Sequence, residues 1–329
     1  MGRDMTHTAD PDRPHPSDTG SESLDQHRAN PACPGDPTDL ADPADLTNPA
    51  DPVGLTDPAD PAGRFWFAVT ADVIRSRRLT PRAQAQQHIQ TALERFNALL
   101  KPASKVAMGA VPSLAGCLAS SFTLGRGDEL QGVLVADAPL LAVLRHLRGL
   151  LQPIQIRIGV GLGTIVTPVD PEDSWQMDGP AFRQSRQALE RLGHTTLPQT
   201  FMMVEGATET RPGRQAISSQ ASRLQDRVNV LLALTDELMR RWTAAQWEAI
   251  DTLERNPTYR AAAQVLGITS QNVHKRVRAA GWPAVAQAEE LANREIQQFL
   301  GDRGGRSERA GRSRSVEPGQ PPVSLGGRS

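Results

Sequence analysis

The sequence predicts an α+β domain followed by an all-α domain, with an irregular tail at each end of the 329-residue chain. Strand-like and helix-like segments alternate from residue 64 to about residue 162, whereas from about residue 218 apolar residues recur only at helical spacing. Residues 1–62 contain no Ile, Phe, Trp or Tyr, and the last residues are rich in Gly, Arg, Ser and Pro. Such segments cannot bury enough apolar surface to fold, so we expect both tails to be disordered.

These observations divide the chain into five segments. The first tail also carries a tandem Asp-Pro repeat over residues 40–60, whose units are too short to form a solenoid. We predict a tail over residues 1–62, an α+β domain over 63–205, a connector with a long helix over 206–241, a helical domain over 242–300 and a second tail over 301–329.

The formal net charge of −1 conceals a segregation of charge along the chain. Residues 1–62 carry 13 acidic and 3 basic side chains, whereas residues 63–301 carry 27 basic and 21 acidic ones. A basic folded part favours a polyanionic partner. We interpret the acidic tail as solubilising disorder, with competition against a polyanion for the basic surface as the alternative.

The sequence also excludes some classes of protein. No apolar run reaches the ~18 residues that a membrane span needs, and the N-terminus lacks the apolar core of a signal peptide. The two cysteines, Cys33 and Cys117, fall in a predicted tail and a predicted strand, and give neither a disulfide framework nor a metal site. We therefore expect a cytoplasmic protein with no membrane partner.

The order of elements in the first domain predicts its topology. Apolar alternation and turn residues indicate strands, and apolar residues spaced by three and four indicate helices. The resulting βαββαβ order is the ferredoxin-like topology, in which the first and third strands are neighbours. The expected elements are strand 65–73, helix 81–100, strand 117–124, strand 130–135, helix 138–151 and strand 154–162, with 200–204 as a candidate edge strand.

This topology brings two carboxylates together at one end of the sheet. Asp72 ends the first strand and Asp128 lies in the hairpin turn before the third, so the two converge. Two carboxylates with phosphate oxygens suit Mg²⁺, the one cofactor that the sequence suggests. As the alternative, Asp128 is a turn residue and Asp72 stabilises a strand end. On the last strand, Gly159 and Gly161 would let a ligand or a helix approach the sheet closely.

Four segments of this domain resemble the SatD family. They are FAVTADVIRS at 67–76, GDELQG at 127–132, RIGVGLG at 157–163 and DGPAF at 178–182 followed by Arg186, and they lie in the family's order. More distantly, the same segments resemble class III nucleotidyl cyclases. That resemblance implies metal ligation by Asp72 and Asp128. It makes Arg157, Gly159, Gly161, Asp178 and Arg186 the candidate contacts of a nucleotide or another phosphorylated ligand.

The chain departs from the cyclase pattern at two positions that determine specificity. Leu124 stands where cyclases place a purine-reading lysine, four residues before the hairpin aspartate. If Arg186 is the arginine that steadies the cyclase transition state, Phe182 stands where the accompanying asparagine would be. We therefore do not expect cyclase activity, and an enzyme is not the favoured interpretation of this domain.

The helical domain carries the pattern of a regulator's helix-turn-helix. Thr243 is expected to cap a helix over 244–255 that ends at Asn256-Pro257, and a second helix spans 258–266. Gly267 supplies the positive φ of a tight turn, and Thr269 or Ser270 caps a third helix over 270–280. The string Ala-x-x-Leu-Gly-Ile-x-x-x-x-Val over residues 263–273 indicates this motif.

Helical geometry assigns the faces of the third helix. Val273 and Val277 should point into the core with Leu266 and Ile268. The opposite face is polar and basic, and such side chains read base edges or hold phosphates. A plain helical bundle with a solvated basic face is the alternative. The candidate DNA contacts are Ser270, Gln271, Asn272, Lys275, Arg276 and Arg278, with Arg260 from the preceding helix and His274 at the flank.

Two further helices flank this motif. One begins at Ser218 or Ser219 and continues through Leu238, and the other follows Pro283 to about Leu300. Each carries an apolar stripe that suits packing or a homodimer. We hypothesise a cytoplasmic DNA-binding transcriptional regulator whose first domain senses a ligand or mediates assembly. A Mg²⁺-dependent enzyme that binds or processes nucleotides is the alternative, and an interaction protein that binds neither DNA nor metal is a third.

Overall fold

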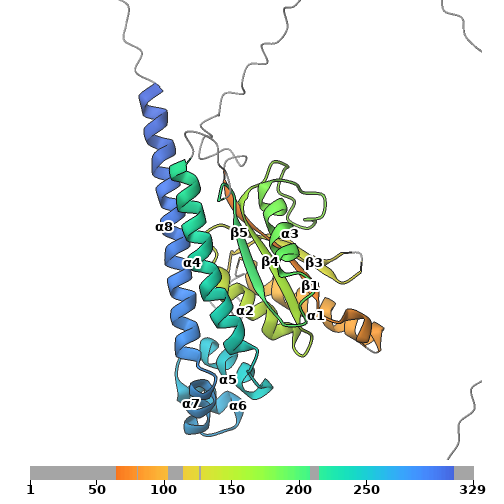
Figure 1. Cartoon of the computed structure of the whole chain (residues 1–329). Helices are drawn as coiled ribbons and strands as arrows, with labels where there is room; N and C mark the ends of the chain where they lie inside the picture. Colours follow the sequence, from red (N-terminus) through yellow and green to blue (C-terminus); the bar gives the residue numbers. More distant parts are fainter. Residues whose placement is uncertain (1–63, 80, 103–113, 126, 208–214, 315–329) are drawn as a thin grey trace, which may run out of the picture. The chain divides into compact units, whose positions relative to one another are not determined.

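The computed structural model describes residues 64–79, 81–102, 114–125, 127–207 and 215–314 (Figure 1). The tail predicted over residues 1–62 lies outside them. The described residues form a mixed α and β structure around a five-stranded sheet with the strand order β2-β3-β1-β4-β5. The strands are β1 (Phe65–Val73), β2 (Leu118–Leu124), β3 (Glu129–Val135), β4 (Ile156–Thr164) and β5 (Thr200–Val204).

The first strand lies in the middle of the sheet, which explains its nearly continuous apolar sequence FWFAVTADV. β1 pairs antiparallel with both β3 and β4, and β2 pairs antiparallel with β3. β5 adds a parallel edge strand beside β4, as residues 200–204 suggested. This register places Asp72 between Glu129 on one neighbouring strand and Arg157 on the other.

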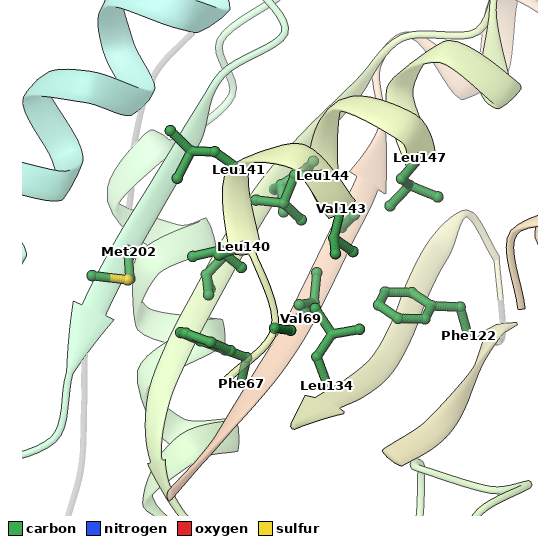
Figure 2. Packing of buried hydrophobic residues seen from close by; sticks show 14 of the residues in the cluster. Phe67, Val69, Phe122, Leu134, Leu140, Leu141, Val143, Leu144, Leu147 and Met202 are labelled. Atoms are coloured by element: carbon green, nitrogen blue, oxygen red, sulfur yellow. The ribbon is translucent and has the colours of Figure 1, made fainter. Parts of the chain in front are cut away.

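Two helices, α1 (Arg82–Leu100) and α2 (Leu140–Leu151), cover one face of the sheet. α1 buries Ile89, Leu93 and Phe96 at helical spacing. Figure 2 shows Phe67 and Val69 of β1 beneath the apolar side of α2, where they join the main hydrophobic core.

A third helix, α3 (Pro180–Leu192), covers the opposite face and was not predicted. Its buried residues are mostly small, and it lies directly on the glycines of β4. A Cβ atom on Gly159 would overlap the backbone of Ser185, and one on Gly161 would overlap the backbone of Ala181. The close approach that these glycines permit is therefore occupied by a helix. The short 3-10 helix η2 (Ser76–Arg78) follows β1.

The remaining layer consists of two long helices, α4 (Gln215–Met239) and α8 (Trp282–Arg314), which lie side by side (Figure 1). α4 packs on β5, and buried residues of both helices join the main core. Both differ from the expected bounds. α4 begins before Ser218, whose hydroxyl donates to the carbonyl of Ala207 at 3.3 Å instead of capping the helix.

α8 continues to Arg314, although Gly301 and the Gly/Arg-rich sequence after it predicted a tail from residue 301. A single glycine costs a helix only about 1 kcal/mol, so it does not by itself end one. Within the described ranges, no helix combines the length and apolar character that crossing a membrane requires.

Candidate nucleic-acid interface

Three short helices, α5 (Ala244–Arg255), α6 (Tyr259–Leu266) and α7 (Ser270–Ala279), form a separate cluster with its own small core. Each begins with a threonine that caps it. Thr243 accepts from the amide of Gln246 and forms a reciprocal capping box with that residue. Thr258 accepts from Ala261 at 3.1 Å, and Thr269 accepts from Asn272 at 3.2 Å. The cap of α7 is therefore Thr269, and Ser270 is its first helical residue.

The turn between α6 and α7 is built as the sequence predicted. Gly267 has φ 65° and ψ 27°, the left-handed conformation in which a residue without Cβ is favoured. The amide of Ile268 donates back to the carbonyl of Ala263 at 3.1 Å, which closes the end of α6. This turn fixes the direction in which α7 leaves α6.

Two alanines and two valines hold the three helices together. Ala262 and Ala263 are buried on α6, and Val273 and Val277 are almost fully buried on α7. Leu266 and Ile268 pack against them, which confirms the predicted inner face of α7. Trp242 is also part of this core, and its indole Nε1 donates to the carbonyl of Ala280 at 2.7 Å.

The opposite face of α7 is polar, basic and exposed. Within the described part of the chain, Gln271, Lys275 and Arg278 are exposed and make no side-chain hydrogen bond or ion pair with another described residue. Asn272 is also exposed. The predicted outer face is thus present in the structure as an unpaired row of donors with two cationic groups.

Three other predicted contacts differ in their surroundings. Arg260 on α6 is exposed, as is His274, whose ring stacks edge-on against Tyr259. The side chain of Arg276 is 33% exposed, and its guanidinium lies 3.8 Å from the carboxylate of Glu248 on α5. Arg276 therefore has an internal partner that sequence reasoning did not anticipate.

A buried arginine joins this cluster to the sheet domain, and it was missed by sequence reasoning. Arg145 on α2 donates from Nη1 and Nη2 to Glu254 on α5 at 2.8 and 2.6 Å, and from Nε to Glu289 on α8 at 2.7 Å. Its guanidinium also lies over the ring of Trp282. Burial opposes its charge, but the two carboxylates outweigh burial and raise the pKa of Arg145. The available signal was the string Arg-His-x-Arg in the otherwise apolar α2.

The two other polar residues of that string are buried as well. His146 lies near Asp251 and Glu254 of α5, and burial lowers its pKa to about 3, so its ring is neutral at physiological pH. Arg148 donates to the carbonyl of Ile156 and to the hydroxyl of Thr200, both at 2.8 Å, and these contacts fasten α2 to β4 and β5. α2 thus contacts the sheet, α5 and α8 through polar side chains.

The two candidate metal ligands of the sheet domain have backbones that lie close together. The amide of Val73, next to Asp72, donates to the carbonyl of Asp128 at 3.1 Å. The carboxylate of Asp72 forms an ion pair with Arg157 across the strands. Among the residues that the structure describes, no group of three or more His, Cys, Asp or Glu side chains is arranged to hold a metal ion. Metal binding by Asp72 and Asp128 stays a prediction.

The predicted ligand contacts have different surroundings in the structure. Gly159 and Gly161 lie under α3, and Arg157 forms an ion pair with Asp72. Asp178 accepts from the amide of Gly179 just before α3, while Arg186 is exposed on that helix. The helix α3, rather than a ligand, therefore lies over the glycine-rich strand β4.

Comparison with known proteins agrees with the segments that resembled one family. The SatD family model matches residues 66–293, which include the sheet domain, the three-helix cluster and the start of α8. The chain therefore belongs to the SatD family. No curated protein and no solved structure matches the chain.

Proposed function

We propose that this protein is a cytoplasmic transcriptional regulator that binds double-stranded DNA through the exposed face of α7. In this proposal α5, α6 and α7 are a helix-turn-helix, and α7 is its recognition helix in the major groove. The observation that carries it is the unpaired row of Gln271, Lys275 and Arg278 on a helix whose other face is locked in a core.

The chemistry of this row suits a duplex better than a plain solvated surface. Glutamine and asparagine can pair with adenine edges, and arginine and lysine with guanine edges or phosphates. Thr269 and the first amides of α7 place a helix N-terminus beside these side chains, and that end attracts phosphate. Arg260 on the neighbouring helix supplies a further cation for the DNA backbone.

The test is a fluorescence-anisotropy titration of the full chain against a pool of random duplexes at several salt concentrations. We expect Lys275→Ala and Arg278→Ala each to weaken binding. Loss of a phosphate contact would reduce the slope of log K against log salt by about 1, and loss of a base contact would cost about 1–3 kcal/mol.

A matched control is Arg95→Ala, because Arg95 is also an exposed arginine in the middle of a helix but lies on α1. This variant should bind duplexes as the parent does. The proposal is wrong if the parent binds no duplex at low salt. It is also wrong if the two α7 variants bind as well as the Arg95 variant.

We further propose that the sheet domain is a sensor or assembly unit with ferredoxin-like topology. The support is the β1-α1-β2-β3-α2-β4 order with antiparallel neighbours in the order β2-β3-β1-β4. The sheet domain would act on the proposed DNA-binding helices through α2, because Arg145 of that helix contacts both α5 and α8. A change that moves α2 would therefore move the proposed DNA-binding helices.

A further inference from the structure

Three of the large apolar side chains that are exposed in the described residues gather on the outer side of α4 and α8. Val230 and Leu234 on α4 are 59% and 60% exposed, and Leu291 on α8 is 38% exposed. Val230 and Leu234 are one helical turn apart and thus share a face. A large contiguous patch of exposed apolar side chains marks a surface that another molecule covers, whereas apolar residues scattered singly do not.

The geometry of the two helices places all three at one level. α4 and α8 run antiparallel, because Leu238 lies near Gly281 whereas Arg227, three turns earlier, pairs with Glu295 at 2.7 Å. On α8, Leu291 comes one turn before Glu295, the partner of Arg227. Because the helices are antiparallel, Leu291 lies beside the part of α4 that comes one turn after Arg227. That position is between Val230 and Leu234. The apolar patch therefore crosses the seam between the two helices.

The outer face of α4 is complementary to itself. The exposed residues of the helix include Arg227, Val230, Leu234 and Glu237 in that order, together with Arg223, Asp226 and Ala233. In an antiparallel pair of two α4 helices, one register sets Val230 opposite Leu234 of the second copy. The same register sets Arg227 opposite Glu237 of the second copy, and two-fold symmetry repeats both pairs. This register therefore matches one apolar pair and one pair of opposite charges.

We infer that the protein self-associates as a two-fold dimer through this α4–α8 face, with a second copy of the chain as the occupant. Arg227 already pairs with Glu295, and Glu237 with Arg240 and Arg241, in their own chain. Arg227 and Glu237 are themselves exposed, and ion pairs of exposed side chains are weak, so these pairs do not compete strongly with a contact between chains. α4 spans 25 residues, about 37 Å, which gives a four-helix interface of two helices from each copy adequate length.

Light scattering or sedimentation of the full chain tests this inference. The measurement is made without DNA, so the result does not depend on the proposed function. We expect the parent to have twice the 35.6 kDa mass of the chain, and Val230→Asp combined with Leu234→Asp to give the monomer mass with unchanged circular dichroism. Val166→Asp is the matched control, because Val166 is 64% exposed but lies outside both helices. It should remain dimeric.

Cross-linking tests the register. In a Cys33→Ser background, we expect a protein with Val230→Cys mixed with one with Leu234→Cys to form more interchain disulfide on oxidation than either protein alone. Cys117 can remain, because it is buried and burial raises its pKa to about 11. A monomeric parent, or a dimer that the double Asp variant leaves intact, would overturn the inference.

Discussion

Arg145 of α2 and Glu254 of α5 form a bidentate ion pair in which both oxygens of the carboxylate accept a hydrogen bond, at 2.8 and 2.6 Å. The side chain of Arg145 is 2% exposed. The pair joins the sheet domain to the first helix of the three-helix cluster. Glu289 extends it to α8, so a single buried cation lies where three helices meet.

We expect Arg145→Ala to lower the free energy of unfolding by about 3–5 kcal/mol, because it leaves Glu254 and Glu289 close together without their cation. Urea denaturation followed by tryptophan fluorescence measures this. Arg183→Ala is the control, because Arg183 pairs with Asp178 only at the surface, at 3.7 Å. Its effect should stay below about 1 kcal/mol. Equal stability of the two variants would contradict the structural role of Arg145.

Stability should also fall in mild acid because of His146. Burial, with smaller contributions from Arg145 and Arg255, lowers the pKa of this histidine from 6.5 to about 3. Between these two values the unfolded chain binds a proton that the folded chain does not, so stability is lost as the pH falls below 6.5. At pH 5 the loss relative to pH 7.5 should be about 2 kcal/mol.

The comparison that isolates His146 is urea denaturation of the parent and of His146→Gln at both pH values. Glutamine does not titrate, so the loss between pH 7.5 and 5 should be smaller in the variant by that amount. Equal pH dependence of the two proteins would show that His146 is not buried in its neutral form.

Gly161→Ala should destabilise the fold by about 2–3 kcal/mol, because the added Cβ would overlap the backbone of Ala181 and force α3 away from the sheet. Gly301→Ala provides the opposite case. A Cβ there meets nothing within 4 Å, and alanine favours the helical conformation of α8, so stability should rise by up to about 1 kcal/mol. Thermal melting compares the two. A tolerated Gly161→Ala would contradict the packing of α3 on β4.

The alternative function, a Mg²⁺-dependent nucleotide site, makes a separate prediction at Asp72. It requires a Mg²⁺-dependent rise in melting temperature with nucleoside triphosphates that Asp72→Asn and Asp128→Asn abolish. If these carboxylates instead have the structural roles of a strand end and a turn, no such rise should occur, and the ion pair of Asp72 with Arg157 favours that outcome. A rise that both substitutions remove would favour the alternative, and turnover of the nucleotide would be needed to make it an enzyme.

Local signals in the sequence were sufficient for the three-helix cluster. The cap Thr243 and the positive φ of Gly267 depend on neighbours within a few residues, and both were predicted correctly. The same holds for the inner face of α7, since a period of 3.6 residues places Val273 and Val277 together.

Interactions between distant residues were not predictable in this way. The partners of Arg145 are 109 and 144 residues away, and a charged residue in an apolar helix does not reveal its partner. The closeness of the backbones at Asp72 and Asp128 followed from topology, but the pairing of Asp72 with Arg157 depends on strand register. α3 was missed because its buried face, Ala181, Phe182, Ser185 and Ala188, is too small and mixed to indicate a core helix.

The measurement that tests the central claim most directly is a genome-wide map of the DNA that the protein occupies in its native cells, for the parent and for the Lys275→Ala, Arg278→Ala double variant. The parent should occupy a discrete set of sites that share a sequence. The double variant, at equal abundance and with unchanged melting temperature, should lose them. A parent map that cannot be distinguished from that of cells lacking the protein would contradict DNA recognition by α7.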